Sequence, residues 1–181
     1  MRIIAGAWRG RSLIAPPGTE TRPTADRVRQ ALFDMLMHAP WGGRSLIEDA
    51  TVLDVFAGTG ALGLEALSRG AASAAFVERS RPALTALRAN IEACGAKVRC
   101  EVLAIDALLS PAGERADIVF LDPPYGQELV PRALARLRSA GRVRPGSLIV
   151  AESGRLEQAL AVEALAERMH GAARVTIWRE G

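Results

Sequence analysis

Polar and apolar positions in residues 44–181 alternate between two periods. Residues 51–56 form a short apolar run, and the continuous apolar runs at 117–121 and 147–151 are typical of central parallel strands that are covered on both faces. Two more strands are predicted, one at 73–77 and one at 98–102, where apolar residues occupy every second position of the latter. Helical periodicity separates these strands at three places: 61–69, the stretch between Ser80 and Gly95, and 128–137. The alternation of strands and helices predicts an α/β fold with a doubly wound, mostly parallel sheet.

The two ends of the chain differ from this pattern. Residues 163–169 and 174–179 predict an antiparallel C-terminal hairpin that turns at His170 and Gly171. In residues 1–43, the stretches 2–5 and 11–15 predict a β-hairpin, and a helix is expected to begin at Pro23 and Thr24. The apolar stripe of that helix is formed by Val28, Leu32, Met35 and Leu36. We therefore expect a main domain at 44–181 and an N-terminal appendage at 1–43, whose helix covers one face of the sheet.

Length and composition agree with one α/β core. The chain has 181 residues, of which 49% are hydrophobic, enough for one domain and too few residues for two. No run approaches 18 apolar residues and no signal peptide is evident, so we expect a cytoplasmic protein without a membrane anchor. Cys94 and Cys100 lack metal-ligand spacing, so we expect reduced thiols and no metal. We also expect a monomer.

Basic charge is concentrated near the N-terminus. The net charge is only +3, yet residues 1–29 contain six arginines against two acids. Arginine suits phosphate and stacked bases, so a polyanionic partner is one interpretation. A GC-rich genome would also favour arginine, and a charge cluster can be merely a solvated face. The candidate phosphate contacts are Arg2, Arg9, Arg11, Arg22 and Arg27.

A glycine-rich loop follows the first strand of the main domain. Gly58, Thr59, Gly60 and Gly63 fit the pattern GxGxxG at the start of a helix. Glycines there allow a tight turn and a close approach of a ligand to the backbone. Glu78, which ends the next strand, is placed to accept hydrogen bonds from ribose hydroxyls. The loop alone indicates a nucleoside-containing ligand and does not separate nicotinamide dinucleotides from S-adenosylmethionine.

Two further acids favour S-adenosylmethionine. Asp54, at the end of the first strand, would repel a pyrophosphate and would suit a ligand that carries an ammonium and a sulfonium. The alternative for Asp54 is a carboxylate that caps a helix or braces the loop. Asp106 and Ala107 follow the third strand, where Asp106 can accept from the adenine amino group; an N-cap role for Asp106 is equally consistent.

The four residues Asp122, Pro123, Pro124 and Tyr125 directly follow a buried strand. The Asp122 carboxylate and the Pro123 carbonyl can accept both N–H bonds of a planar exocyclic amine and stabilise the charge that grows on it. Tyr125 can stack on the acceptor base and orient the nitrogen. A simple strand terminator is the alternative, but it does not explain all four residues beside a cofactor loop. The combination predicts methyl transfer to a planar amine.

The motifs together resemble the class I methyltransferases, and the N-terminal segments resemble the RsmD family in particular. These segments are the stretch 2–6 with Arg9 and Arg11, then 22–24 with Arg27 and Arg29. The resemblance implies a bacterial enzyme that methylates N2 of a guanine in 16S ribosomal RNA, free or in the small subunit, and releases S-adenosylhomocysteine. It also implies cofactor contacts at Asp54, the glycine loop, Glu78 and Asp106. Trp178 stands in the final segment, where the family has a tyrosine-containing ending.

Two alternatives stay open from the sequence. The Asp-Pro-Pro-Tyr motif is shared with enzymes that methylate other RNA bases, DNA bases or a protein amide, so the motif alone defines only a planar amine. A noncatalytic RNA-binding module with a relict cofactor pocket is a second alternative. The intact glycine loop beside an intact Asp-Pro-Pro-Tyr motif argues against it.

Overall fold

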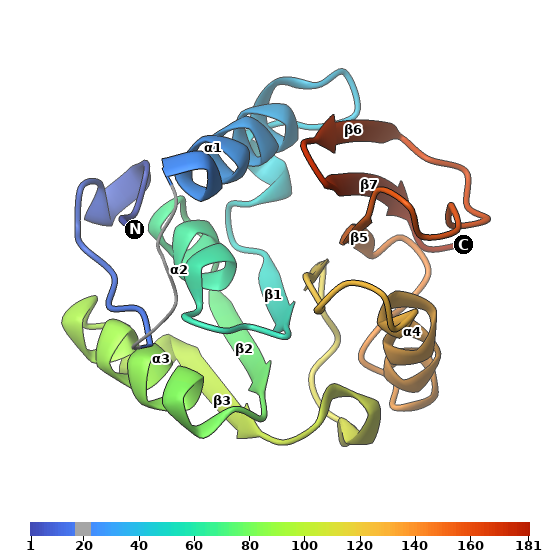
Figure 1. Ribbon diagram of the computed structural model, residues 1–181. Coiled ribbons are helices and arrows are strands. Elements are labelled where there is room, and N and C mark those ends of the chain that lie inside the picture. Colours follow the sequence, from blue (N-terminus) through green and yellow to red (C-terminus); the bar gives the residue numbers. More distant parts are fainter. Residues whose placement is uncertain (17–22) are drawn as a thin grey trace.

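The computed structural model describes residues 1–16 and 23–181. Over these residues the strands form one seven-stranded sheet with the order β3-β2-β1-β4-β5-β7-β6 (Figure 1). The strands are β1 (Thr51–Val55), β2 (Ser73–Glu78), β3 (Cys100–Ala104), β4 (Ile118–Leu121), β5 (Leu148–Gly154), β6 (Ala166–His170) and β7 (Ala173–Arg179). Strands β1 to β5 pair in parallel, whereas β7 is antiparallel to both β5 and β6. The predicted doubly wound sheet with an antiparallel C-terminal hairpin is confirmed.

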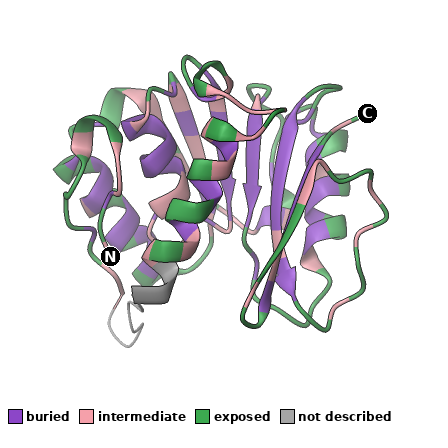
Figure 2. Cartoon of the chain, turned by 90° about the horizontal axis from the view of Figure 1, so that it is seen from above, coloured by how far each residue is buried: buried purple, intermediate pink, exposed green. Residues whose placement is uncertain are grey.

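Helices cover both faces of the sheet, as Figure 2 shows. They are α1 (Pro23–His38), α2 (Ala61–Ser68), α3 (Arg81–Ala93) and α4 (Leu129–Ser139). Successive side chains of a strand point to opposite faces, so each strand contributes to two cores. The first core lies under α1, α2 and α3, and the second lies under α4.

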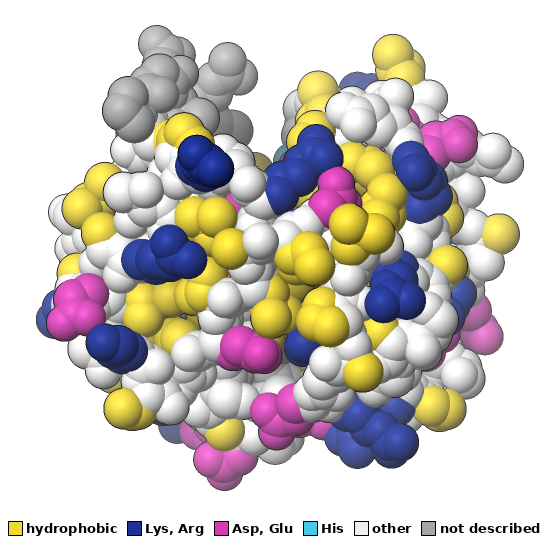
Figure 3. All heavy atoms as spheres, turned by 90° about the horizontal axis from the view of Figure 1, so that it is seen from below, with side chains coloured by type: hydrophobic (Ala, Val, Ile, Leu, Met, Phe, Trp, Pro, Cys, Tyr) yellow, Lys and Arg dark blue, Asp and Glu magenta, His cyan; other side chains and the backbone are white. Residues whose placement is uncertain are grey.

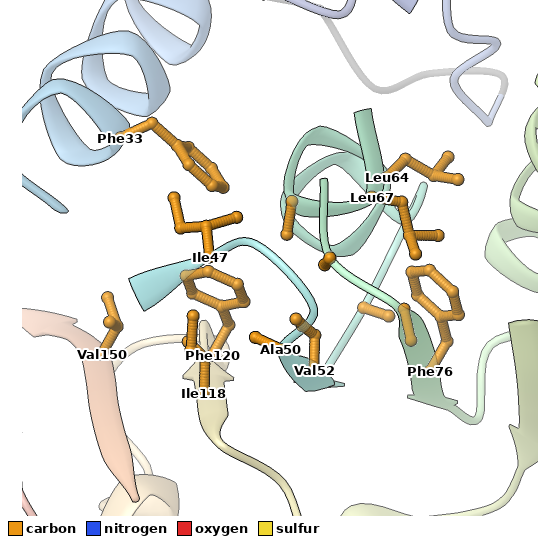
Figure 4. Close-up of a cluster of buried hydrophobic side chains, with 14 of the residues drawn as sticks. Phe33, Ile47, Ala50, Val52, Leu64, Leu67, Phe76, Ile118, Phe120 and Val150 are labelled. Carbon is orange, nitrogen blue, oxygen red and sulfur yellow. The ribbon is translucent and has the colours of Figure 1, made fainter. Parts of the chain in front are cut away.

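The first core joins the N-terminal helix to the sheet. Phe33 of α1 is fully buried, and its ring centroid lies 5.8 Å from that of Phe120 in β4. Ile47 belongs to the same buried cluster and is drawn beside both rings in Figure 4. Leu32 and Leu36 of the predicted apolar stripe are also buried. The expected role of α1 as a cover over one sheet face is confirmed by this packing.

The N-terminal segment is fastened to α2 by a buried carboxylate. Glu65 is fully buried, and it accepts hydrogen bonds from the backbone N–H groups of Ile4 (2.7 Å) and Ala5 (3.0 Å). Its charge is balanced by Arg69 at 2.8 Å and by Arg29 at 3.7 Å. Because these contacts run from residues 4 and 5 to α2, the N-terminal segment packs directly against the main domain. A domain boundary at residue 43 stays a prediction.

The structure corrects two sequence-based expectations. The stretches 2–5 and 11–15 form one antiparallel bridge, Arg2 with Ser12, around a 3₁₀ turn at Gly6–Trp8, and not a full hairpin. The Ala5 N–H, which would continue the ladder beyond the hydrogen bonds of Ile3 with Arg11 and of Leu13 with Met1, donates to Glu65 Oε1 instead. Val98 was expected in a strand with one buried face, but it lies in the 3₁₀ turn Lys97–Arg99 and is 95% exposed. Strand β3 begins at Cys100, opposite Ala74, so Val98 lies beyond the start of β2.

Cys94 and Cys100 are free thiols, and burial raises the pKa of both. Within residues 1–16 and 23–181, no helix is long and apolar enough to cross a membrane. Over the same residues, no group of three or more His, Cys, Asp and Glu side chains is arranged to hold a metal ion.

Candidate active site

The candidate site lies at the carboxyl edge of the parallel strands, where the strand order reverses between β1 and β4. Open α/β sheets bind ligands at such switch points. The register pairs Val55 with both Val77 and Leu121, and Leu121 with Ala151. The residues one step further along each strand, Phe56, Glu78, Asp122 and Glu152, therefore form a row along this edge.

The glycine loop between β1 and α2 is held from two sides. The Gly58 N–H donates to Glu78 Oε2 at 2.8 Å, and the Asn90 side chain donates to the Thr59 carbonyl at 3.0 Å. Gly60 has φ of +78°, and a Cβ there would lie 2.4 Å from Leu87 Cδ1. Both facts require glycine at position 60. The loop is thus a fixed backbone surface rather than a free turn.

Glu78 supports two loops through its two carboxylate oxygens. While Oε2 accepts from Gly58, Oε1 accepts from the backbone N–H groups of Arg79 (2.8 Å) and Ser80 (2.7 Å). The Ser80 side chain itself makes no cap hydrogen bond at the start of α3. A carboxylate offers about four lone-pair positions, so Glu78 retains capacity for ribose hydroxyls in the adjoining cavity.

Asp54 braces the glycine loop from below. Its side chain is 2% exposed, and Oδ2 accepts from the Gly63 N–H of α2 at 2.8 Å. Burial raises the pKa of Asp54 to about 8, an effect that the Gly63 hydrogen bond opposes and the charges of Asp122 and Glu78 increase. The hydrogen bond to Gly63 gives Asp54 the loop-bracing role that the sequence left as an alternative. The Asp54 carboxyl group also lines a cavity, so this hydrogen bond does not exclude a contact with a cation bound there.

Asp106 has the N-cap role that its position suggested. Its Oδ1 accepts from the Leu108 N–H at 2.9 Å, at the start of the 3₁₀ turn Ala107–Leu109. Its Oδ2 accepts from Arg79 at 2.7 Å. The hydrogen bond from Leu108 lowers the pKa of Asp106, and Arg79 lowers it further. Asp106 and Ala107 both line the cavity beside Glu78, so the cap and an adenine contact are compatible.

The Asp-Pro-Pro-Tyr segment leaves β4 at the middle of the edge. Asp122 is reachable from the cleft but has protein on its other sides; this desolvation, with the negative charge of Glu152, raises the pKa of Asp122 to about 7. Pro123 is buried and Pro124 is exposed. The Tyr125 hydroxyl donates to Glu152 Oε1, and burial followed by this hydrogen bond raises the pKa of Tyr125. The segment is thereby tied to the neighbouring strand β5.

Two cavities meet at this segment. One has a volume of about 780 Å³ and is lined by Glu78, Asp106 and Ala107, among others. The other has a volume of about 560 Å³, and its lining includes Asp54, Gly58, Thr59, Glu152 and His170. Phe56, Asp122 and Tyr125 line both cavities. A ligand in the first cavity and an acceptor in the second would therefore be adjacent at Asp122.

Three lining residues were missed by the sequence reasoning. Phe56 has φ of +64°, which is unusual for a bulky residue and marks a constrained position at the meeting point of the cavities. Glu152 directly follows the apolar run 148–151, just as Asp122 follows the run 118–121, and that parallel was available in the sequence. His170 was seen only as a turn residue, since nothing local brings the C-terminal hairpin to the cleft.

The predicted phosphate-contacting arginines that the structure describes do not line either cavity. Arg2, Arg9, Arg11 and Arg27 are exposed, and Arg22 lies outside the described residues. Arg11 donates to the Ala93 carbonyl at the end of α3. Figure 3 shows basic side chains dispersed over one face among hydrophobic and acidic ones, not merged into one patch. Arg29, the sixth arginine of the cluster, is buried, pairs with Asp26 at 3.0 Å and lines the second cavity.

The sheet order, the glycine loop after β1 and the Asp-Pro-Pro-Tyr segment after β4 define a Rossmann-like class I methyltransferase, a class that depends on S-adenosylmethionine. The family model described as Conserved hypothetical protein 95 matches residues 1–179. The chain belongs to this family, the RsmD family of methyltransferases.

Comparisons with individual proteins agree. The chain is 42% identical over 155 residues to Ribosomal RNA small subunit methyltransferase D of Escherichia coli strain K12, covering 84% of this chain and 74% of that protein. It is similar to the solved structure of the Escherichia coli methyltransferase yhhF, with a TM-score of 0.83, 38% identity and coverage of 99% and 97%. An RNA methyltransferase from Salinibacter ruber, solved with S-adenosyl-L-homocysteine, shares the fold at 17% identity, a TM-score of 0.59 and coverage of 89% and 93%.

Proposed function

We propose that this chain transfers a methyl group from S-adenosylmethionine to the exocyclic N2 amine of a guanine in 16S ribosomal RNA. The observation that carries the proposal is the position of Asp122 and Tyr125 where the two cavities meet. The ribosomal substrate is supported by the name of the Escherichia coli relative, a ribosomal RNA small subunit methyltransferase. The choice of guanine N2 rests on the family resemblance of the sequence.

The residues around the first cavity fit S-adenosylmethionine. The lining of the cavity of about 780 Å³ includes two acids, Glu78 for the ribose and Asp106 for the adenine amino group. Asp54 is a buried acid beside the glycine loop, and its pKa of about 8 allows a nearby cation to ionise it. When bound, S-adenosylmethionine supplies a methyl group on a positively charged sulfur. Asp54, Gly58 and Thr59 line the second cavity, so the cofactor would extend from the first cavity to the border of the second. The proposed holding residues are Asp54, Gly58, Thr59, Gly60, Glu78, Asp106 and Ala107.

The acceptor amine is handled by the segment after β4. The lone pair of an exocyclic amine is delocalised into the ring, so the nitrogen is a weak nucleophile. Asp122 and the carbonyl of Pro123 accept its two N–H bonds and stabilise the positive charge that develops on the nitrogen. Tyr125, with 44% of its surface exposed, offers a ring on which the base can stack. A base within RNA structure must be turned outward to reach this cleft.

The partner is proposed to be 16S ribosomal RNA, free or within the small subunit. Arg2, Arg9 and Arg27 are exposed and suited to phosphate contacts. The described residues of one chain supply the proposed catalytic groups, which supports action as a monomer.

Transfer of a labelled methyl group separates this proposal from its alternatives. The protein is incubated with labelled S-adenosylmethionine and, in turn, with total RNA, DNA and protein from a strain that lacks the gene. Label in small-subunit RNA alone supports the proposal. Label in DNA or protein supports a different amine acceptor, and binding of RNA and cofactor without any transfer supports a noncatalytic module.

A further inference from the structure

We propose that Glu152 determines base specificity by accepting a hydrogen bond from the ring N1–H of guanine while Asp122 accepts from the N2 amine. This inference rests on the proposed function and deepens it, because it assigns a reason for choosing guanine. Glu152 belongs to β5, outside the Asp-Pro-Pro-Tyr motif.

The register of the sheet places the two carboxylates side by side. Strands β4 and β5 are parallel, and Leu121 pairs with Ala151, so Asp122 and Glu152 occupy the next equivalent positions. Neighbouring strands are about 4.8 Å apart. Phe120 and Val150, two residues earlier in each strand, both belong to the core under α1 to α3. Because strand side chains alternate with period two, both carboxylates leave the sheet toward that same face.

Both side chains line the cavity of about 560 Å³ that also contains Asp54 and the glycine loop. Glu152 is partly exposed to it. The Tyr125 hydroxyl occupies Oε1 of Glu152, whereas Oε2 accepts no hydrogen bond from any residue in the described ranges 1–16 and 23–181. One oxygen is thus engaged in holding the tyrosine, and the other is available to an occupant of the cavity.

Strand β5 and its following loop also hold Tyr125 in place. Gly154 lies two residues beyond Glu152, and a Cβ there would lie 3.3 Å from the Tyr125 Cβ, so its lack of a side chain makes room for the tyrosine. Glu157 accepts from the Gly126 N–H. The same short stretch of chain therefore holds both the tyrosine ring on which the base would stack and the acceptor oxygen that would meet the edge of the base.

The chemistry of two adjacent acceptors selects a particular edge. Ionised carboxylates accept hydrogen bonds and donate none. Guanine presents two neighbouring donors, N1–H and the N2 amine, to such a pair. Adenine and cytosine carry an amine beside a ring nitrogen that is itself an acceptor, so either base would set a lone pair against Glu152. A well-matched pair of contacts of this kind discriminates between bases by about 10- to 100-fold.

The test pairs a base analogue with enzyme variants. Small subunits are reconstituted with either guanosine or 2-aminopurine at the mapped target; 2-aminopurine keeps the amine but has an unprotonated N1. The parental enzyme should methylate guanosine at least about 10-fold faster than 2-aminopurine. In Glu152→Gln, whose amide can donate to N1, this ratio should fall at least about 10-fold.

Two further variants separate specificity from support of the fold. Tyr125→Phe breaks the hydrogen bond to Glu152 but leaves the carboxylate, so its ratio should stay near the parental value even if both rates fall. Glu152→Ala removes the acceptor without adding a donor, and should lower the rate on guanosine more than the rate on 2-aminopurine. A parental ratio in both Glu152 variants would overturn the inference and leave the proposed function intact. Failure of the parental enzyme to form N2-methylguanosine would overturn both.

Discussion

The backbone N–H of Gly58 lies 2.8 Å from Glu78 Oε2, so the cofactor loop and the proposed ribose acceptor are one unit. Glu78→Ala removes the ribose contacts and also leaves the Gly58, Arg79 and Ser80 amides without their acceptor. Charge-assisted hydrogen bonds contribute about 1.5–3 kcal/mol each. We expect the dissociation constant for S-adenosylmethionine, measured by calorimetry, to rise about 10- to 100-fold or more.

Glu78→Gln is the matched variant, because its amide oxygen can still accept from Gly58. It should weaken cofactor binding less than Glu78→Ala does. An unchanged dissociation constant in a folded Glu78→Ala protein would remove Glu78 from the proposed cofactor contacts.

Asp122→Ala should act on the rate and not on cofactor affinity. In the proposed mechanism the carboxylate stabilises charge that develops only in the transition state, and loss of one such contact costs about 100- to 1000-fold in rate. Single-turnover methyl transfer, with cofactor affinity measured in parallel, checks this. Glu48→Ala serves as a control, since Glu48 is an exposed acid whose ion pair within the described part of the chain is with Arg44 at 3.5 Å. Near-normal turnover in an Asp122→Ala protein that binds cofactor would contradict the mechanism.

The pKa of Asp54 predicts how stability depends on pH. Folding raises this pKa from 3.8 to about 8, so the folded ligand-free protein favours the protonated acid. The stabilisation is complete below pH 3.8 and is lost as the pH rises through about 8. A single group of this kind changes the unfolding free energy by at most about 1.4 kcal/mol per pH unit. Asp54→Asn keeps an acceptor for Gly63 and should flatten the profile between pH 5 and roughly 8.

Urea unfolding of the ligand-free protein at several pH values provides the measurement. Some slope should remain in the variant, because the pKa of Asp122 is also raised, to about 7. Profiles that run parallel in the parent and in Asp54→Asn would show that Asp54 is ionised in the folded protein at neutral pH.

Arg9 is the cleanest test of phosphate contacts in the N-terminal segment. It is exposed, whereas Arg11 already donates to the Ala93 carbonyl. Each lost phosphate contact should reduce the slope of log affinity against log salt concentration by about 0.7–0.9. We expect Arg9→Ala to flatten the slope for RNA binding and to leave cofactor affinity unchanged, and the Arg9/Arg11 double variant to flatten it further. Parental slopes in both variants would limit the segment to a structural role.

Local patterns in the sequence were sufficient to predict the order of strands and helices, and the reasons are physical. Buried parallel strands require continuous apolar runs, and the turn from β1 into α2 requires glycine at Gly60 because of its positive φ and its closeness to Leu87. The same patterns placed Asp54, Glu78 and Asp122 at the ends of strands, where the structure has them. Their roles as ligands to cofactor and base remain proposals.

Long-range contacts explain what sequence reasoning did not predict. The bracing of Gly63 by Asp54 and the capture of residues 4 and 5 by Glu65 join segments that no local pattern connects. The place of Glu152 beside Asp122 depends on the register of two strands. His170 lines the cavity because β7 pairs with β5 and thereby places the β6–β7 hairpin, which contains His170, next to the cleft.

The central claim is methylation of guanine N2 in small-subunit RNA, and identification of the methylated nucleoside tests it most directly. Small ribosomal subunits and free 16S ribosomal RNA from a strain that lacks the gene are incubated with the protein and labelled S-adenosylmethionine. The RNA is then digested to nucleosides, which are separated and identified by mass spectrometry. We expect the label to appear in N2-methylguanosine, at one mapped position, with the parental protein, and at a rate at least about 100-fold lower with Asp122→Ala. Label in any other nucleoside, or equal label with both proteins, would contradict it.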